Sequence, residues 1–302
     1  MDILSQTNLK MTQTKSSAQI IRSKFKNESH KDLINYLNNL YNKLNKINPM
    51  SESKNNYNFD LDKKIVMKDD EYFFGLIIEL RKLKSFEKVV KNFFSKINTR
   101  ILIVCSENNY EFIKTKYIKD LIKKEKIFIY NIGKFDSLSP SDYNKMLLSE
   151  NFWELLPKCK KVIVFQTDSL LCAKSNFVID DFKEFDYIGS AWDFKRPIGL
   201  NINGGSGGLS LRDLSMTKKV LKEFCPFNWP GGEDGYFAFH MELVGGNVAS
   251  YKNAAKFSTQ THFHYESFGC HKVSRLYKKY HKDFYKYCPE STEIENPFSP
   301  DF

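Results

Sequence analysis

The feature that most constrains the fold is an alternation of short apolar runs with amphipathic stretches, which begins at about residue 64. The apolar runs have the length of buried strands and occupy residues 72–80, 100–106, 126–132 and 161–168. The stretches between them have helical spacing and cover residues 85–97, 110–124 and 139–157, the last as two short helices. Strands that alternate with helices form βαβ units. The sequence therefore predicts an α/β fold with a mostly parallel, Rossmann-like sheet flanked by helices.

Residues 1–62 are predicted to form a polar, partly flexible arm with one amphipathic helix. Within residues 29–47, apolar side chains recur at helical spacing, and Ser29 is suited to cap the helix. This helix either docks on a partner or on a second copy of the chain, or it packs on its own domain. The main domain is expected over residues 63–290, with residues 291–302 as a C-terminal tail.

Length and hydropathy indicate a folded protein without a membrane span. The 302 residues, 41% of them hydrophobic, can form one large core or two smaller ones. No stretch approaches the roughly 18 consecutive apolar residues of a membrane-spanning helix. The N-terminus also lacks the apolar region of a signal peptide, so a cytoplasmic location is expected.

The cysteines form no Cys-x-x-Cys pair, and they are Cys105, Cys159, Cys172, Cys225, Cys270 and Cys288. Cys105 and Cys172 lie in apolar runs that are typical of strands. The six thiols are therefore predicted to be reduced and mostly structural. Neither disulfides nor a zinc cluster is expected.

The formal net charge of +10 is compatible with an anionic partner, such as nucleic acid, an acidic lipid surface or a phosphorylated small molecule. The lysines are spread widely, however, with clusters in IKKEK (122–126) and LYKKYHKDFYKY (276–287). This distribution favours a solvated basic face. Charge alone decides little about function.

Polar side chains follow two of the predicted strands at the point where each apolar run ends. Glu79 and Arg81 stand at the end of the first run, and Gln166 and Asp168 at the end of the fourth. In an open α/β sheet, ligands bind beyond the carboxyl ends of the strands, so we expect a polar site at this edge. Asp168 either binds Mg²⁺ or Mn²⁺ there or caps the following turn, and both interpretations stay open.

The segment NINGGSGGLSLRD (201–213) is predicted to be a loop ahead of a helix that starts near Asp213. It is rich in glycine, with Gly204, Gly205, Gly207 and Gly208. Paired glycines let the backbone approach a ligand closely, although they also form ordinary tight turns. Their spacing matches neither a P-loop nor the dinucleotide fingerprint, which disfavours nucleotide hydrolysis and hydride transfer.

The segment NWPGGEDGYFAFHM (228–241) places Glu233 and Asp234 at the start of a predicted helix, after a Pro-Gly-Gly turn. Two adjacent carboxylates can supply a general base and a group that binds an acceptor. The helix dipole alone would also favour them at this position. The neighbouring Trp229 favours the functional interpretation, because sugars stack on aromatic rings.

Half of the chain's six histidines lie in THFHYESFGCHK (261–272), namely His262, His264 and His271. Neutral imidazole is a common metal ligand, and three histidines in one loop-like segment favour at least one functional ligand. In an extended segment His262 and His264 would share one face, so only part of the trio need bind a metal.

Taken together, the order of these motifs resembles the GT-A nucleotide-sugar glycosyltransferases. VIVFQTDSLLC resembles the strand end that carries their Asp-x-Asp motif, and WPGGEDGYF is similar to a segment of the inverting β-galactosyltransferases. The resemblance is closer to an uncharacterised glycosyltransferase-like family with a Phe-Gln-Thr-Asp motif, and it covers about residues 72–275. The shared segments are LSPSDYNKMLLSENFWELLP, VIVFQTDSLLC, FDYIGSAW, GGLSLR, GEDGYF and ESFGCHK.

The resemblance implies a GT-A fold for the main domain and a role for each matching residue on the donor side. Asp168 would bind the metal or the diphosphate, and Thr167 stands between it and Gln166, which takes the place of the first Asp of Asp-x-Asp. Arg81, with Glu79 two residues before it, would meet the nucleotide. Uridine diphosphate sugars are the commonest donors in this fold.

The implied cofactor is Mn²⁺ or Mg²⁺. His271, or His264 as the second choice, would correspond to the C-terminal metal-binding histidine of many GT-A enzymes. The departure at Gln166 leaves metal dependence open, because an amide carbonyl is a weaker ligand than a carboxylate.

The implied reaction is an inverting hexosyl transfer to a hydroxyl group of a glycan or another acceptor. Asp234 would be the catalytic base and Glu233 an acceptor ligand. The rest of the implied acceptor site consists of Trp229, Trp192, Gly207 and Gly208.

Three alternatives accompany this hypothesis. In a retaining transferase, Asp234 would only orient the acceptor. The presence of Gln166 in the metal position also suits a carbohydrate- or nucleotide-binding module without catalysis. The charge of +10 and the polar arm motivate a nucleic-acid-binding protein, but no helix-turn-helix, RRM or zinc-finger pattern supports it.

Overall fold

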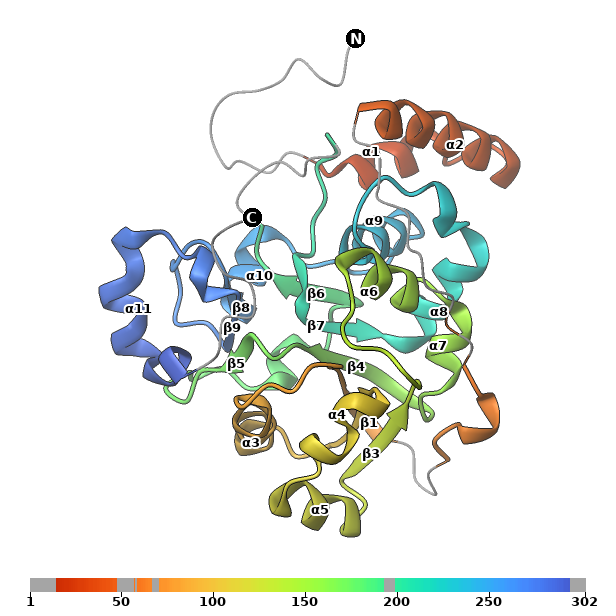
Figure 1. The fold of residues 1–302 in the computed structure, drawn as a ribbon. Helices are drawn as coiled ribbons and strands as arrows, with labels where there is room; N and C mark the ends of the chain where they lie inside the picture. The colour runs from red at the N-terminus through yellow and green to blue at the C-terminus, as the bar shows by residue number, and fades with distance from the viewer. Residues whose placement is uncertain (1–14, 48–56, 58, 67–70, 193–198, 294–302) are drawn as a thin grey trace.

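A computed structural model describes residues 15–47, 57, 59–66, 71–192 and 199–293 (Figure 1). Its centre is a six-stranded sheet in the order β3-β2-β1-β4-β7-β6. The strands are β1 (Glu71–Ile78), β2 (Arg100–Cys105), β3 (Ile127–Asn131), β4 (Cys159–Phe165), β6 (Tyr187–Ser190) and β7 (Ser206–Asp213). The first four are parallel, and β7 is antiparallel to both of its neighbours. The predicted mixed α/β fold with a mostly parallel sheet is confirmed.

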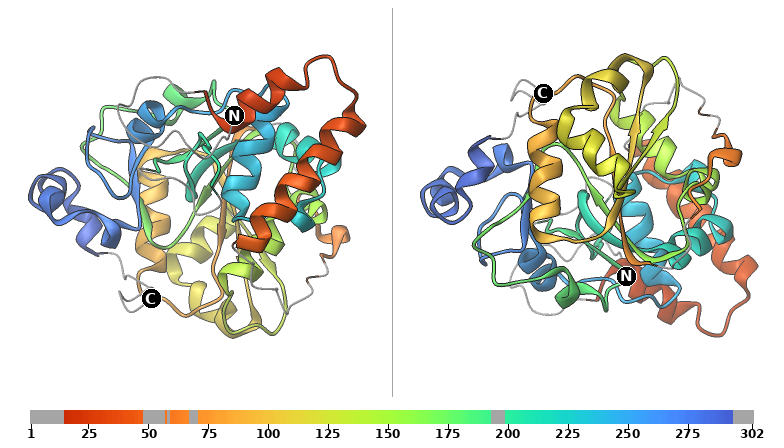
Figure 2. Two further views of the ribbon diagram at one scale, coloured as in Figure 1. Left: turned by 90° about the horizontal axis from the view of Figure 1, so that it is seen from above. Right: turned by 90° about the horizontal axis from the view of Figure 1, so that it is seen from below.

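Helices cover both faces of the sheet (Figures 1 and 2). One face packs against α3 (Phe86–Lys96), α4 (Glu107–Ile113), α5 (Lys116–Lys123) and α10 (Tyr251–Phe257), and α11 (His281–Tyr287) lies farther out, beyond β8 and β9. The other packs against α6 (Pro140–Leu147), α7 (Glu150–Glu154), α8 (Leu214–Glu223) and α9 (Glu233–Leu243). Along β1, Phe74 and Leu76 pack on the face covered by α6 to α9, and Ile77 packs on the opposite face. This alternation is the two-residue period of a strand. Burial on both faces explains why the strands are continuous apolar runs in the sequence.

A second, smaller sheet lies beside the carboxyl end of β4. It has the order β5-β9-β8, with β5 (Ser169–Leu171), β8 (Ser258–Thr259) and β9 (Gly269–His271). Residues 166–168 form the turn that joins β4 to β5. Short 3₁₀ helices complete the described fold: η1 (Leu61–Lys63), η2 (Ile179–Phe182), η3 (Pro226–Asn228), η4 (Val273–Arg275), η5 (Lys278–Tyr280) and η6 (Pro289–Glu293). In the part of the chain that the structure describes, every helix is too short or too polar to cross a membrane.

The N-terminal segment packs on the main domain (Figure 2). The predicted helix is α2 (His30–Ile47), and a second helix, α1 (Ser17–Lys24), precedes it where the sequence analysis expected only one. A capping box starts α1, because Ser16 Oγ accepts the Gln19 backbone N–H and Gln19 Oε1 accepts the Ser16 N–H. Of the alternatives for α2, packing on its own domain is the one seen. Residues 1–14, 48–56 and 58 of the predicted arm, and residues 294–302 of the predicted tail, lie outside the described residues.

Two further segments differ from the sequence predictions. The helix predicted over residues 110–124 is divided into α4 and α5, because the Thr115 side chain caps a new helix by accepting the Ile118 N–H. The glycine-rich segment predicted to be a loop contains β7 instead. Leu209 and Leu211 are buried and pair with β4, and this burial outweighs the poor strand propensity of glycine.

His240 lies fully buried on α9 and links that helix to α2. Its Nδ1 lies 2.8 Å from the Tyr236 carbonyl oxygen, which can only accept, so Nδ1 carries the proton. Nε2 therefore accepts a hydrogen bond from the Tyr41 hydroxyl at 2.8 Å. Burial lowers the pKa of His240 to about 3, despite the opposing effect of the Tyr236 carbonyl.

This buried neutral imidazole predicts that the protein loses stability as the pH falls below about 6.5, the ordinary histidine pKa. The folded-state pKa lies below the unfolded one, so only the unfolded chain takes up the proton over this range. The contribution of His240 to the free energy of unfolding is complete above about pH 6.5. Below that pH it declines by about 1.4 kcal/mol per pH unit until the folded-state pKa is reached. Urea unfolding of the native protein and of His240→Phe across this range measures it. Identical pH slopes in the two proteins would contradict the prediction.

Candidate functional site

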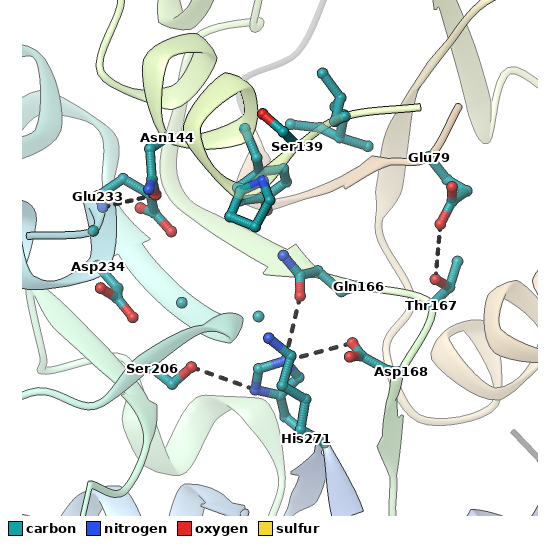
Figure 3. Close-up of a pocket in the computed structure, with 18 of the residues that line it drawn as sticks. Glu79, Ser139, Asn144, Gln166, Thr167, Asp168, Ser206, Glu233, Asp234 and His271 are labelled. Carbon is teal, nitrogen blue, oxygen red and sulfur yellow. Dashed lines mark hydrogen bonds and ion pairs between the residues drawn. The ribbon is translucent and has the colours of Figure 1, made fainter. Parts of the chain in front are cut away.

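A cavity of about 290 Å³ opens at the carboxyl ends of β1 and β4 (Figure 3). Its walls come from the turn after each of these strands, the start of β7, the N-terminal parts of α6 and α9, and the end of β9. Because β7 runs antiparallel to β4, its first residues reach this same edge of the sheet. The volume is near the lower end of the range for small-molecule sites. The structure therefore has a cavity at the sheet edge where the sequence predicts a polar site.

Three side chains converge on one side of the cavity. His271 Nε2 lies 3.4 Å from Asp168 Oδ1 and 3.3 Å from Gln166 Oε1. Pairing of β5 with β9 produces this arrangement, because it sets Ser169 opposite His271. Asp168 and His271 are buried, and neither carboxylate oxygen of Asp168 has a hydrogen-bond partner among the described residues. Carboxylate, amide and imidazole groups that meet in this way could hold a divalent cation.

The electrostatic environment keeps Asp168 ionised. Burial alone would raise the pKa of its carboxyl group, but the His271 ring, 3.4 Å from Oδ1, and the charge of Lys272 together outweigh burial and lower the pKa. Lys272 also lines the cavity. The site thus combines a buried anion with the nearby cationic side chain of Lys272.

Glu79 organises the neighbouring wall. Its buried carboxylate accepts hydrogen bonds from Arg81 Nε at 2.8 Å, from Arg81 Nη2 at 2.7 Å and from Thr167 Oγ1 at 2.9 Å. Asn109 Nδ2 donates to the carbonyl oxygens of Glu79 and Arg81, and so fixes the backbone of this turn. The structure brings together all five predicted donor-site residues: Glu79, Arg81, Gln166, Thr167 and Asp168. Within this set, Glu79 holds Arg81 and Thr167 in place.

Gly207 and Gly208 make room for the functional side chains. A Cβ atom on Gly208 would lie 2.1 Å from His271 Nε2 and 2.7 Å from Gln166 Oε1. A Cβ atom on Gly207 would lie 2.3 Å from Glu233 Oε1. Both glycines line the cavity as predicted, and their lack of a side chain is what allows these close contacts.

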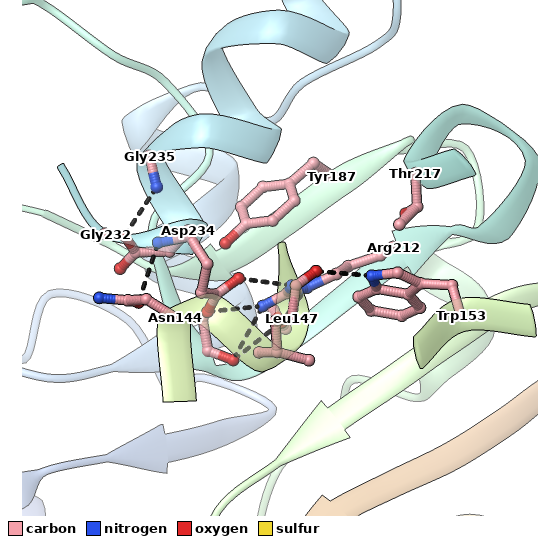
Figure 4. Close-up of polar contacts among 12 residues, drawn as sticks. Asn144, Leu147, Trp153, Tyr187, Arg212, Thr217, Gly232, Asp234 and Gly235 are labelled. Atoms are coloured by element: carbon pink, nitrogen blue, oxygen red, sulfur yellow. Dashed lines mark hydrogen bonds and ion pairs between the residues drawn. The ribbon is translucent and has the colours of Figure 1, made fainter. Parts of the chain in front are cut away.

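A buried ion pair supports the acidic turn at the start of α9 (Figure 4). Arg212 Nη1 and Nη2 donate to Glu233 Oε2 and Oε1 at 2.6 and 3.1 Å, and the Arg212 side chain is fully buried. Burial alone would lower the pKa of Arg212, but the charge and hydrogen bonds of Glu233 together with the nearby Tyr187 and Tyr143 outweigh burial and raise the pKa, so the guanidinium stays charged. Glu233 was predicted to bind an acceptor. It lines the cavity, and its two carboxylate oxygens bind Arg212.

Asp234 is the other carboxylate of this turn and also lines the cavity. Figure 3 shows it across the cavity from Asp168. Its Oδ1 accepts the Gly235 backbone N–H at 2.7 Å, while the Glu233 N–H donates to Asn144 Oδ1 at 3.0 Å. These contacts attach the start of α9 to α6 and set the direction of the Asp234 side chain.

Three predicted site residues do not line this cavity of the described structure. Trp229 is only 2% exposed, packs edge to face on Tyr41 and donates its indole N–H to the Gly232 carbonyl at 3.0 Å. It therefore supports the Gly-Gly turn from within the core and has no ring face for a sugar. Trp192 packs partly buried against the apolar core. His264 stacks on His262 with ring centroids 5.1 Å apart, so the structure does not place it with Asp168.

Sequence reasoning missed several residues of the cavity and its support. Ser139, Tyr143 and Asn144 reach the cavity from the N-terminal part of α6, a segment predicted only as a helix. Arg212 lies within the glycine-rich segment that was predicted to be a loop, so it was not recognised as a buried residue. A basic residue on an apolar strand is a signal that could have identified it, because a buried charge requires a partner.

Comparisons with known proteins give a family of unknown function and a distant structural similarity. The sequence model of the family described as "Protein of unknown function (DUF5672)" matches residues 130–271. No curated protein matches the sequence. Among solved structures, the chain is similar to the mannosyltransferase PcManGT from Pyrobaculum calidifontis in complex with GDP-Man and Mn²⁺. The TM-score is 0.33 with 10% sequence identity, over 77% of this chain and 66% of that chain, slightly under two thirds of its length.

Proposed function

We propose that the protein is a glycosyltransferase that moves a sugar from a nucleoside diphosphate sugar to a hydroxyl acceptor. The observation that carries this proposal is the division of one cavity into two chemically distinct sides. A cation-binding donor set, Asp168, Gln166 and His271, occupies one side, and Asp234 occupies the other. A departing diphosphate requires a cation such as the first side could hold, and an attacking hydroxyl requires a base such as the carboxylate on the second side.

The residues on the donor side fit a divalent cation, Mn²⁺ or Mg²⁺. The supporting observation is the buried carboxylate of Asp168, whose oxygens lack hydrogen-bond partners among the described residues. Asp168, His271 and Gln166 would hold the ion, with Gln166 as the weakest ligand. When bound, such an ion neutralises negative charge on a departing diphosphate.

Arg81 and Lys272 would stabilise the same phosphate groups. Both line the cavity, and Glu79 holds the Arg81 guanidinium in place through two hydrogen bonds. Such preorganised positive charge favours the transition state, because it needs no rearrangement as the leaving group becomes more negative. A uridine diphosphate sugar is the first donor to test.

On the acceptor side, Asp234 would act as the general base. It would remove the proton from the acceptor hydroxyl as that oxygen bonds to the anomeric carbon and the bond to the diphosphate breaks. Glu233 is less suited to this role, since both of its oxygens bind Arg212. Attack from the face opposite the diphosphate would invert the anomeric configuration.

A thermal-shift screen of UDP- and GDP-sugars, with and without Mn²⁺, tests the proposal. A ligand at a hundredfold excess over its Kd stabilises the folded state by about 2.7 kcal/mol, so a true donor should raise the Tm measurably. Asp168→Asn should lose the Mn²⁺-dependent part of the shift, whereas Asp180→Asn, at an exposed position, should keep it.

Release of the nucleoside diphosphate in the presence of candidate acceptors then separates catalysis from binding. A donor that stabilises the protein but is never turned over would support a binding module without catalysis. No shift with any nucleotide sugar would contradict the proposed function.

A further inference from the structure

Three cysteines that are far apart in the sequence meet in the core between the small sheet and the C-terminal helix. Cys172 follows β5, Cys270 lies in the middle of β9, and Cys288 caps the end of α11. Their sulfur atoms all lie within 4.8 Å of one another, and all three side chains are fully buried. The sequence does not predict such a cluster, because the three positions form no recognisable spacing.

We propose that Cys172, Cys270 and Cys288 bind a thiophilic divalent cation of the zinc type as a structural site. Thiolate sulfur is the ligand that selects such ions over magnesium or calcium. Zn–S bonds of about 2.3 Å place tetrahedral sulfur ligands about 3.8 Å apart. The observed upper limit of 4.8 Å means that each pair need close by no more than about 1 Å to reach that geometry.

Structural zinc sites take four ligands, and Glu290, close by in the chain, would supply the fourth after a rotation of its side chain. It follows Cys288 by two residues, and its Oε1 accepts the backbone N–H of Ala173, next to Cys172, at 2.6 Å. Glu290 is only half-buried, so its carboxylate can turn without disturbing the core. The four side chains come from three separate parts of the chain.

The site would secure a weakly connected part of the fold. β5 and β9 pair over only three residues each, and β8 adds two more. A cation at the three sulfurs would bind this small sheet to the end of α11. Since His271 follows Cys270 directly on β9, the same cation would fix the strand that places His271 beside Asp168.

Metal analysis of the full-length protein, produced in zinc-supplemented medium and purified without chelator, tests the proposal. We expect about one Zn²⁺ per chain to survive dialysis, as structural zinc sites bind tightly. Exchange of Zn²⁺ for Co²⁺ should give a thiolate-to-metal charge-transfer band, which reports cysteine ligands specifically. Removal of the metal by a chelator should lower the Tm by on the order of 5 °C.

Variants assign the metal to this site. Cys270→Ser and Cys172→Ser should lose the retained zinc and the Co²⁺ band. Cys225→Ser, an exposed cysteine outside the cluster, should keep both. Asp168→Asn should also keep both, which separates this site from the candidate cation site in the cavity.

Measurements on the native protein decide the matter even if a variant fails to fold. A native chain that retains no zinc and gives no Co²⁺ band overturns the proposal, as does a mass lower by two hydrogens that maps to a disulfide between two of the three cysteines. Failure of the proposed glycosyl transfer would leave the zinc result unaffected, because metal content and the Co²⁺ band require no sugar donor.

Discussion

Asp234→Asn is expected to lower kcat by about 100- to 10,000-fold, the usual contribution of a positioned general base. The amide has nearly the same size as the carboxylate but cannot accept the proton of the acceptor hydroxyl. Donor affinity should change little, because Asp234 lies across the cavity from the residues proposed to bind the diphosphate. Initial rates of nucleoside diphosphate release give kcat, and calorimetric titration of the donor gives its Kd.

Asp180→Asn is a matched control, since it makes the same chemical change at an exposed position away from the cavity. It should leave kcat unchanged. Undiminished turnover in Asp234→Asn would remove Asp234 from the mechanism. Proton NMR of the product adds an independent check. If the product has the same anomeric configuration as the sugar donor, the reaction is retaining, and Asp234 would only orient the acceptor.

Arg212→Met is expected to lower the free energy of unfolding by about 3–5 kcal/mol, the usual cost of removing one partner of a buried ion pair. The substitution leaves the 3% exposed Glu233 carboxylate without its bidentate partner. It also removes a cation that lies within 5.2–5.8 Å of the ring centroids of Trp153, Tyr187 and Phe237. Urea unfolding monitored by tryptophan fluorescence measures the loss.

A double-mutant cycle with Glu233→Gln isolates the pair itself. The double variant should be more stable than the sum of the single changes implies, because it no longer contains an uncompensated buried charge. Strict additivity of the three free energies would show that the two side chains are not coupled.

The central sheet could be predicted because its information is local. Strands β1 to β4 are buried on both faces, so each is a compact apolar run that can be recognised without knowledge of its neighbours. β7 could not be recognised in the same way. Its glycines have low strand propensity. The strand is stabilised by its pairing with β4, which lies more than forty residues earlier in the chain.

The meeting of the residues proposed to bind the donor could be predicted for a geometric reason. Parallel strands end at one edge of a sheet, so the polar residues after β1 and β4 were bound to meet there. The proposed acceptor side depends on the directions of individual side chains, which a sequence does not contain. Trp229 stands beside the acidic turn in the sequence, yet its ring points into the core. Arg212 and the three clustered cysteines depend on contacts between distant segments, and for these the sequence offers only residue types.

The packing of the N-terminal helices has a practical consequence for protein production. Glu242, near the opposite end of α9 from Asp234, accepts hydrogen bonds from Ser16 Oγ at 2.6 Å and from Gln19 Nε2 at 2.7 Å. A shortened expression fragment that starts at residue 63, where the strand and helix alternation begins, would strip these contacts and the Tyr41 hydroxyl from the same helix. A fragment that is meant to keep these contacts must begin before Ser16, because a later start would expose the face of α9 that contacts α1 and α2, on the helix that carries the proposed base.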